Sequence, residues 1–175
     1  MDSSEFLDFL STRASVREYS NELLSDDQVM FILDSAVTAP SAGNLESWDV
    51  VVVRSPEERE TLSDAAYQQH HVAHAGALFV VCANYIRSMS RYGERGILYA
   101  VQDATIACCY MMLAAHAAQL RSCWVGAFNE DEVKGLLDLP AHIRPVAILC
   151  VGKGRAPSSF TERMAIGEHV HWEHW

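Results

Sequence analysis

The chain has 175 residues, of which 50% are hydrophobic and 21% are charged, a composition typical of one globular domain with its own core. We therefore expect a single domain over residues 1–175. The formal net charge of −10 argues against nucleic acid or an anionic membrane as a partner, because both are bound through clustered Lys and Arg. The first residues lack a basic segment followed by an apolar one, so we expect a cytoplasmic protein without a signal peptide.

The N-terminal segment contains a short helix and an alternating pair of arginines. Apolar residues at helical spacing predict an amphipathic helix over residues 4–10. In the segment that follows, Arg13, Ser15 and Arg17 occupy alternate positions, so in an extended chain their side chains point to one side and could bind one anion together. On these residues alone, a solvated basic turn is the favoured alternative.

A capped helix then leads into a segment of small residues. Ser25 and Gln28 form a capping-box pattern at the start of a helix that ends at Pro40. Residues 39–48, APSAGNLESW, are mostly small, which would let a flat ligand approach the backbone. Within them, Asn44 carries a donor and an acceptor for the edge of a ring such as an imide.

Two buried strands follow, with a helix between them. The apolar runs at residues 49–53 and 77–85 predict strands covered on both faces. A Ser-Pro-Glu-Glu start at residue 55 predicts the intervening helix. Residues 86–96, with several arginines and glycines, predict an exposed loop long enough to act as a lid over a ligand.

Three histidines precede the second of these strands. His70 and His74 are four residues apart, a spacing that could hold a metal ion on a helix. No carboxylate or cysteine with ligand spacing accompanies them. We therefore expect no metal site, and a solvated helix end at His70, His71 and His74.

The run from Leu98 to Leu120 contains no helix breaker and predicts the central helix of the fold. Its apolar residues cover most of the circumference, so this helix must be buried, and a second copy of the chain could cover one side. A membrane span is the alternative. Polar residues such as Asp103 and His116 leave the run shorter than the roughly 20 apolar residues that a bilayer needs, so we expect no membrane partner.

The last part of the chain predicts two strands, a helix and an apolar tail. Residues 121–128 are typical of a short strand and turn, residues 129–139 of a capped helix, and residues 146–152 of a third buried strand. The tail, about residues 158–175, ends in EHVHWEHW. Its tryptophans would be exposed on a monomer, so we expect the tail to pack on a partner subunit.

The five cysteines lie in apolar surroundings and include no CxxC pair. This pattern favours reduced thiols in the core over disulfides or a zinc site. The residues are Cys82, Cys108, Cys109, Cys123 and Cys150.

Five motifs, in order along almost the whole chain, together resemble the FMN-dependent nitroreductase-like flavoprotein family. They are RASVREY at residues 13–19, APSAGNLESW at 39–48, a helix that starts at Asp103, LRSCWVGAF at 120–128, and Arg163 followed by EHVHW at 168–172. The resemblance implies an α+β fold with a mixed central sheet flanked by helices. It also implies a homodimer with the long central helix at its interface, a C-terminal tail exchanged between subunits, and two FMN sites built from both chains.

By this resemblance, Arg13, Ser15 and Arg163 hold the FMN phosphate, a role that suits convergent guanidinium donors in an acidic chain. Arg17 would lie near the flavin pyrimidine edge, where its charge would stabilise the reduced flavin. Asn44 would hydrogen-bond the pyrimidine.

The remaining implied contacts come from two backbone segments. Pro40, Ser41 and Ala42 would lie along the isoalloxazine ring bound to the partner chain. Gly126 and Ala127 would present backbone N–H groups to flavin N5 and O4, and a side chain at residue 126 would obstruct that approach.

The sequence departs from the family pattern at three points. Glu46-Ser47 stands where Gln-Pro is usual, which adds a negative charge near the site and affects substrate choice. Thr161 stands where a second basic residue can precede the phosphate-binding arginine, which weakens the expected grip on FMN. The chain also lacks the inserted helices of larger members, so an open, permissive cavity is expected.

The resemblance implies an oxidoreductase with FMN as cofactor and NADH or NADPH as electron donor. It would reduce a nitroaromatic, quinone or similar small acceptor by a ping-pong mechanism, with no required side-chain acid or base. Three alternatives stay open. They are a flavin-binding or storage protein without turnover, a family variant acting as a flavin reductase or dehalogenase, and a non-flavin structural dimer in which the arginines are surface charges.

Overall fold

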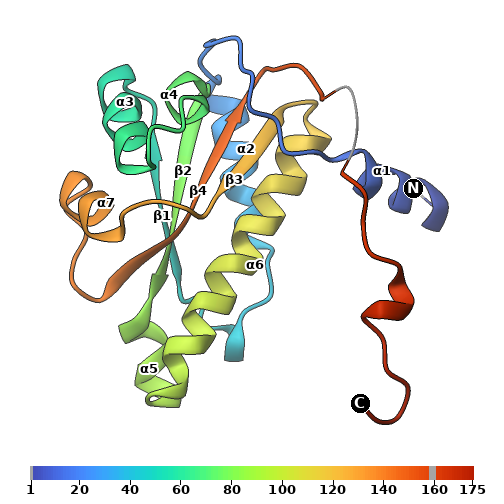
Figure 1. Ribbon diagram of the computed structural model, residues 1–175. Helices are drawn as coiled ribbons and strands as arrows, with labels where there is room; N and C mark the ends of the chain where they lie inside the picture. Colours follow the sequence, from blue (N-terminus) through green and yellow to red (C-terminus); the bar gives the residue numbers. More distant parts are fainter. Residues whose placement is uncertain (1, 158–160) are drawn as a thin grey trace.

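The computed structural model describes residues 2–157 and 161–175, which form a layered α+β fold with one sheet between two groups of helices (Figure 1). The strands are β1 (Trp48–Val53), β2 (Ala77–Asn84), β3 (Arg121–Val125) and β4 (Ile143–Gly152). They pair in the order β1-β2-β4-β3, and every pair is antiparallel.

The prediction of an α+β fold with a central sheet is confirmed, and the prediction of a mixed sheet is wrong for these four strands. Parallel pairing in the described residues is limited to the isolated bridge between Ser15 and Ser122. The N-terminal segment reaches the edge of β3 for this one bridge and does not continue as a strand.

The central strand β2 is buried along nearly its whole length because both of its edges are paired and both faces are covered. Phe79 and Val81 belong to the core on one face, while Leu78 and Val80 belong to the core on the other. The uninterrupted apolar run of this strand follows from this double covering.

On one face of the sheet lie α2 (Asp26–Val37), η1 (Ala42–Asn44), α5 (Tyr85–Tyr92) and α6 (Arg95–Ala117). The predicted capping box of α2 is present, since Ser25 Oγ accepts from Gln28 N (3.2 Å) and Gln28 Oε1 accepts from Ser25 N (3.0 Å). On the other face lie α3 (Pro56–Ala65), α4 (His71–His74) and α7 (Glu130–Leu136), and α1 (Ser3–Thr12) stands beyond the end of α6 (Figure 1).

The central helix α6 is confirmed, although it begins at Arg95, earlier than predicted. Its small and apolar residues pack on α2 and on the sheet. Among the described residues it is the one helix long and apolar enough, by length and composition, to cross a bilayer, and 39% of that stretch is buried in this fold. One side stays open, because Leu98 and Tyr110 are exposed.

The predicted exposed loop at residues 86–96 is wrong, because most of it forms α5 and the start of α6. Asn84 caps α5, and its side-chain oxygen accepts from Arg87 N (3.2 Å). Gly93 has a φ of 56°, which glycine adopts without strain, and it turns the chain directly into α6. Two consecutive helices joined by a tight turn at Gly93 therefore replace the exposed lid loop that was predicted.

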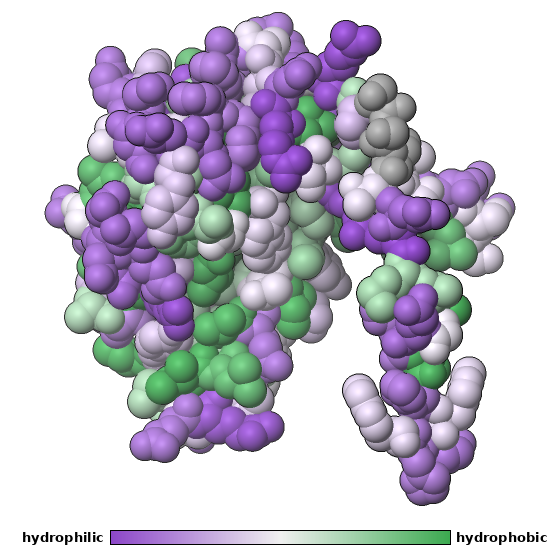
Figure 2. All heavy atoms as spheres, viewed as in Figure 1, coloured by the Kyte–Doolittle hydropathy of each residue, from purple (hydrophilic) through white to green (hydrophobic). Residues whose placement is uncertain are grey.

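The tail, residues 161–175, carries η2 (Ile166–Glu168) and extends away from the body of the protein (Figures 1 and 2). Trp172 is 85% exposed and Trp175 is fully exposed. Met164 and Ile166 are also mostly exposed. The described residues cover these side chains little, apart from the ring of His171, which stacks on Trp175 with centroids 4.4 Å apart. Whether they pack on a second subunit stays a prediction, and residues 158–160 of the predicted tail lie outside the described residues.

Candidate functional site

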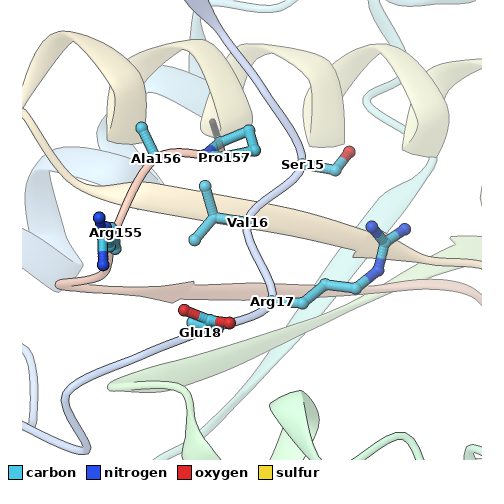
Figure 3. Close-up of a pocket in the computed structure, with 7 residues that line it drawn as sticks. All are labelled: Ser15, Val16, Arg17, Glu18, Arg155, Ala156 and Pro157. Carbon is cyan, nitrogen blue, oxygen red and sulfur yellow. The ribbon is translucent and has the colours of Figure 1, made fainter. Parts of the chain in front are cut away.

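The segment that carries the alternating arginines lies along the edge formed by β3 and the end of β4. Val16 N donates to Ser122 O (2.9 Å), and the Val16 side chain is buried, at 2% exposure. Ser20 N donates to Lys153 O (2.9 Å) and continues the contact. Ser15 and Arg17 therefore point to the same side, away from Val16, as the alternation predicted (Figure 3).

Three arginines from opposite ends of the chain line one hollow of about 560 Å³. We call it the arginine hollow, and its polar lining includes Ser11, Arg13, Ser15, Arg17, Thr161 and Arg163. Within residues 2–157 and 161–175, none of these guanidinium groups forms an ion pair. Free, convergent guanidinium donors are the arrangement that binds a phosphate or carboxylate.

A second hollow of about 520 Å³ adjoins the first and shares Ser15, Arg17 and Pro157 with it (Figure 3). Its lining adds Arg155, whose backbone N donates to Glu18 O (3.3 Å). The region on both sides of Ser15 is thus positively charged, although the whole chain carries a formal charge of −10.

His71 is the residue of this region that the sequence analysis missed, and the predicted solvated position is wrong for it. The side chain is 8% exposed, and its Nε2 has no hydrogen-bond partner among the described residues, whereas His70 and His74 are exposed as predicted. Burial, and next the charge of Arg17, lower the pKa of His71 below its usual 6.5. His71 therefore stands close to Arg17 as a neutral imidazole.

The lowered pKa of His71 predicts that the protein loses stability as the pH falls below about 6.5. The unfolded chain then binds a proton that the folded chain resists, so the free energy of unfolding decreases as the proton concentration rises. Thermal unfolding of His71→Gln should show a smaller drop in melting temperature between pH 7.5 and 5.5 than the parent protein.

The exposed His74→Gln is the matched control, and its pH dependence should equal that of the parent. His116 adds a separate contribution of the same sign, because burial lowers its pKa as well. An unchanged pH dependence in His71→Gln would contradict the assignment to His71.

Residues 40–47, which we call the small-residue turn, are fixed by one buried carboxylate on α6. Asp103 is 2% exposed, and its Oδ1 accepts from Ala42 N (2.8 Å) while its Oδ2 accepts from Ser47 N (3.2 Å). Proline at residue 47, which the family pattern suggests, could not donate the second bond. The departure at Ser47 thus adds a support for the turn.

The corner between α5 and α6 packs directly against this turn. Arg91 Nη1 donates to Gly43 O (3.2 Å), and Arg87 Nη1 donates to Trp48 O (3.0 Å) and to Glu46 O. Gly43 has a φ of 58°, and a Cβ there would lie 2.3 Å from Tyr92 Oη. The positive φ favours glycine at residue 43, and a Cβ there would displace the end of the Tyr92 side chain.

Pro40, Ser41 and Ala42 line a mostly apolar hollow of about 510 Å³ between the turn and α6. Tyr99 and Ile106 are among the α6 residues on its other side. Such a hollow suits the edge or face of a flat, apolar ring system.

The other predicted site residues are less clearly placed. Asn44 is exposed in the turn. Gly126 lines a separate hollow of about 230 Å³, and a Cβ there would meet Trp124 at 3.7 Å, an ordinary contact that requires no glycine in one chain. Ala127 O accepts from Gln69 Nε2 (2.9 Å), which fixes the turn after β3.

The arginine hollow and the small-residue turn lie at opposite ends of α6. Asp103 binds the turn near the start of the helix, and His116, near its end, lies 3.1 Å from Thr12 Oγ1, next to Arg13. Thirteen residues of helix span about 20 Å. One chain therefore keeps these two groups of predicted site residues apart.

No group of His, Cys, Asp and Glu in the described ranges could hold a metal ion. The five cysteines are free, and all but the half-buried Cys109 are buried. Burial raises the pKa of Cys82 to about 12, which keeps its thiol protonated and inert, as the prediction of core thiols requires.

Comparison with known proteins decides the family. A model described as the nitroreductase family matches residues 10–72 and 65–153. The chain belongs to the nitroreductase family. This confirms the resemblance that the motifs indicate.

Relatives match most or all of this member of the nitroreductase family. A protein of Archaeoglobus fulgidus called putative NADH dehydrogenase/NAD(P)H nitroreductase is 31% identical over 98% of this chain and 99% of its own. The FMN reductase (NADPH) of Bacillus subtilis is 28% identical over 79% of this chain and 61% of its own. The structure of NfrA2 from B. megaterium aligns with 100% of this chain and 76% of its own, at 26% identity and a TM-score of 0.91.

Proposed function

We propose that this nitroreductase-family protein is an FMN-dependent oxidoreductase that takes hydride from NADH or NADPH and passes it to a small acceptor in a ping-pong cycle. The observation that carries the proposal is the arginine hollow, in which Arg13, Arg17 and Arg163 face one space without carboxylate partners in the described residues. Relatives named NAD(P)H nitroreductase and FMN reductase support the choice of donor and cofactor.

The residues of the arginine hollow fit the phosphate of FMN. Arg13 and Arg163 supply charged forks and Ser15 a hydroxyl donor, which together can satisfy a dianion. Arg17 has no carboxylate partner in the described residues, so its guanidinium group is available for the electron-rich edge of a reduced ring. When bound, FMN supplies the hydride chemistry, and the protein binds, orients and polarises.

We propose that each FMN lies between two copies of the chain. Asp103, which binds the small-residue turn, and His116, which contacts Thr12 beside the arginine hollow, lie about 20 Å apart along α6, so we infer that a single chain does not offer both places to one flavin. A homodimer that joins α6 helices through their open side would bring the hollow of one copy to the turn of the other. The tail, residues 161–175, would then cover its tryptophans on the partner.

This arrangement predicts that the tryptophans of the tail hold the dimer together. Trp172→Ser combined with Trp175→Ser should weaken dimerisation about 30-fold or more, since a tryptophan at an interface centre contributes about 2 kcal/mol. Light scattering across a dilution series measures the change.

Tyr67→Ser is the matched control, because Tyr67 is also exposed and lies at the end of α3, away from the tail. The prediction fails if the double variant and the parent dissociate at the same concentration.

An absorbance spectrum of the purified protein, followed by anaerobic titration with NADH and then NADPH, tests the function. We expect a yellow protein that is bleached within seconds and is reoxidised by a nitroaromatic or a quinone. A flavin that stays oxidised would instead indicate a binding or storage protein. A colourless protein that takes up no FMN would overturn the proposal and indicate a structural dimer.

A further inference from the structure

Two arginines and two tyrosines interlock at the corner between α5 and α6. The rings of Tyr92 and Tyr99 meet edge to face, with centroids 4.9 Å apart. Arg91 lies over the Tyr92 ring at 5.5 Å, and Arg95 lies over the Tyr99 ring at 5.4 Å. Arg95 Nε also donates to Tyr99 Oη at 2.7 Å. We call these four residues the corner cluster.

The corner cluster adjoins the place proposed for the flavin ring. Tyr99 lines the apolar hollow together with Pro40, Ser41 and Ala42. Arg91 donates to Gly43 O (3.2 Å), so the same cluster also holds the small-residue turn. Arg95 therefore lies one helical turn before Tyr99, and Arg91 contacts the turn itself.

No carboxylate of the described residues is paired with the guanidinium groups of this cluster. Neither Arg91 nor Arg95 forms an ion pair with a described residue, while the neighbouring Arg87 is paired with Asp49 (3.1 Å). The carboxylate of Asp103 is engaged by two backbone amides. Glu94 lies between the two arginines in the sequence and Glu46 lies in the small-residue turn, but neither carboxylate is ion-paired with Arg91 or Arg95.

The guanidinium groups are also held in place. An exposed arginine normally moves among many rotamers, and ordering it costs side-chain entropy. Stacking on Tyr92 and Tyr99, and hydrogen bonds from one nitrogen of each arginine, already impose part of that order. The remaining N–H groups stay available, so the cluster is prepared for an anion.

We propose that the corner cluster is a subsite for the anionic group of a substrate that docks on the flavin, either the 2′-phosphate of NADPH or the carboxylate of an aromatic acceptor. The inference rests on the proposed function, because it places the substrate against FMN. In dinucleotide-binding folds, an arginine that binds the 2′-phosphate is a common way to distinguish NADPH from NADH. The cluster therefore selects substrates by charge, beside a hollow that is mostly apolar.

The test is a pair of matched comparisons on the FMN-loaded protein. One arm measures kcat/KM for NADPH against NADH, together with equilibrium binding of NADP⁺ against NAD⁺. The other arm measures kcat/KM for 4-nitrobenzoate against the neutral 4-nitrobenzamide. Both arms use Arg91→Gln combined with Arg95→Gln, the corresponding double lysine variant, and Lys134→Gln as a charge-matched control on α7.

We expect the glutamine variant to lose about ten-fold or more for the anionic member of at least one pair, with its neutral member changed much less. The lysine variant should recover part of the loss, and Lys134→Gln should equal the parent. Equal changes for charged and neutral members in both arms would overturn the inference. Failure of the proposed function is distinguishable, because it removes turnover of all four substrates in the parent protein itself.

Discussion

FMN affinity should fall about 100-fold when Arg13 is replaced by glutamine, with a similar loss for Arg163→Gln. A hydrogen bond between charged groups contributes about 1.5–3 kcal/mol, and each arginine can make more than one such bond to a phosphate. Both side chains line the arginine hollow and neither is committed to a carboxylate of the described residues. Titration of the apoprotein with FMN, followed by flavin fluorescence, measures the loss.

Riboflavin provides the control ligand, because it has the same ring without the phosphate. If Arg13 binds the phosphate, Arg13→Gln should weaken FMN binding and leave riboflavin binding nearly unchanged. Arg54→Gln is the control variant, since Arg54 is engaged with Asp26 on another part of the surface. Equal losses for FMN and riboflavin would show that Arg13 supports the fold and not the phosphate.

The sequence allowed the arginine hollow to be anticipated because it depends on a local rule. Alternate residues of an extended segment share a side, and Val16 N is in fact bonded to Ser122 O, which keeps the segment extended. The inclusion of Arg163 required the family resemblance, since no local pattern relates it to a residue 150 positions earlier.

The corner between α5 and α6 could not be anticipated, because its determinants conflict locally. Two glycines and several arginines are typical of a loop, yet Gly93 makes a left-handed turn and Gly96 is buried. A Cβ at Gly96 would lie 2.6 Å from Met89 N, so this glycine permits close packing of two helices. Gly96 therefore has a packing role that follows from the tertiary structure, whereas local sequence patterns associate glycine with flexible loops.

The burial of His71 could not be predicted for a related reason. Three histidines in five residues read as a polar surface, and only the position of α4 against the sheet separates His71 from His70 and His74. The same limit applies to the bonds of Asp103, whose acceptor atoms reach amides 56 and 61 residues away. Contacts at such separations depend on topology, which local periodicity does not contain.

Asp103→Ala should lower the free energy of unfolding by about 2–6 kcal/mol, because it leaves the amides of Ala42 and Ser47 without a partner at about 1–3 kcal/mol each. For a chain of this size, each kcal/mol corresponds to a fall of about 2–4 °C in melting temperature. Gln102→Ala, at an exposed neighbouring position of α6, is the matched control and should change the melting temperature little. Equal melting temperatures for the two variants would contradict the assigned role.

The same variant separates a purely structural turn from one that contacts the cofactor. If the small-residue turn lies along the flavin ring of the partner, as proposed, its disorder in Asp103→Ala should also reduce the stabilisation that added FMN gives. Asp103→Asn keeps one acceptor oxygen, so the stabilisation that FMN gives this variant should lie between the values for the parent and for Asp103→Ala. Asp103→Ala should lose the stabilisation given by riboflavin to the same extent, because the turn would contact the ring and not the phosphate. For Arg13→Gln the opposite is expected, with riboflavin binding nearly unchanged. The two variants together therefore assign the two ends of α6 to the two ends of the cofactor.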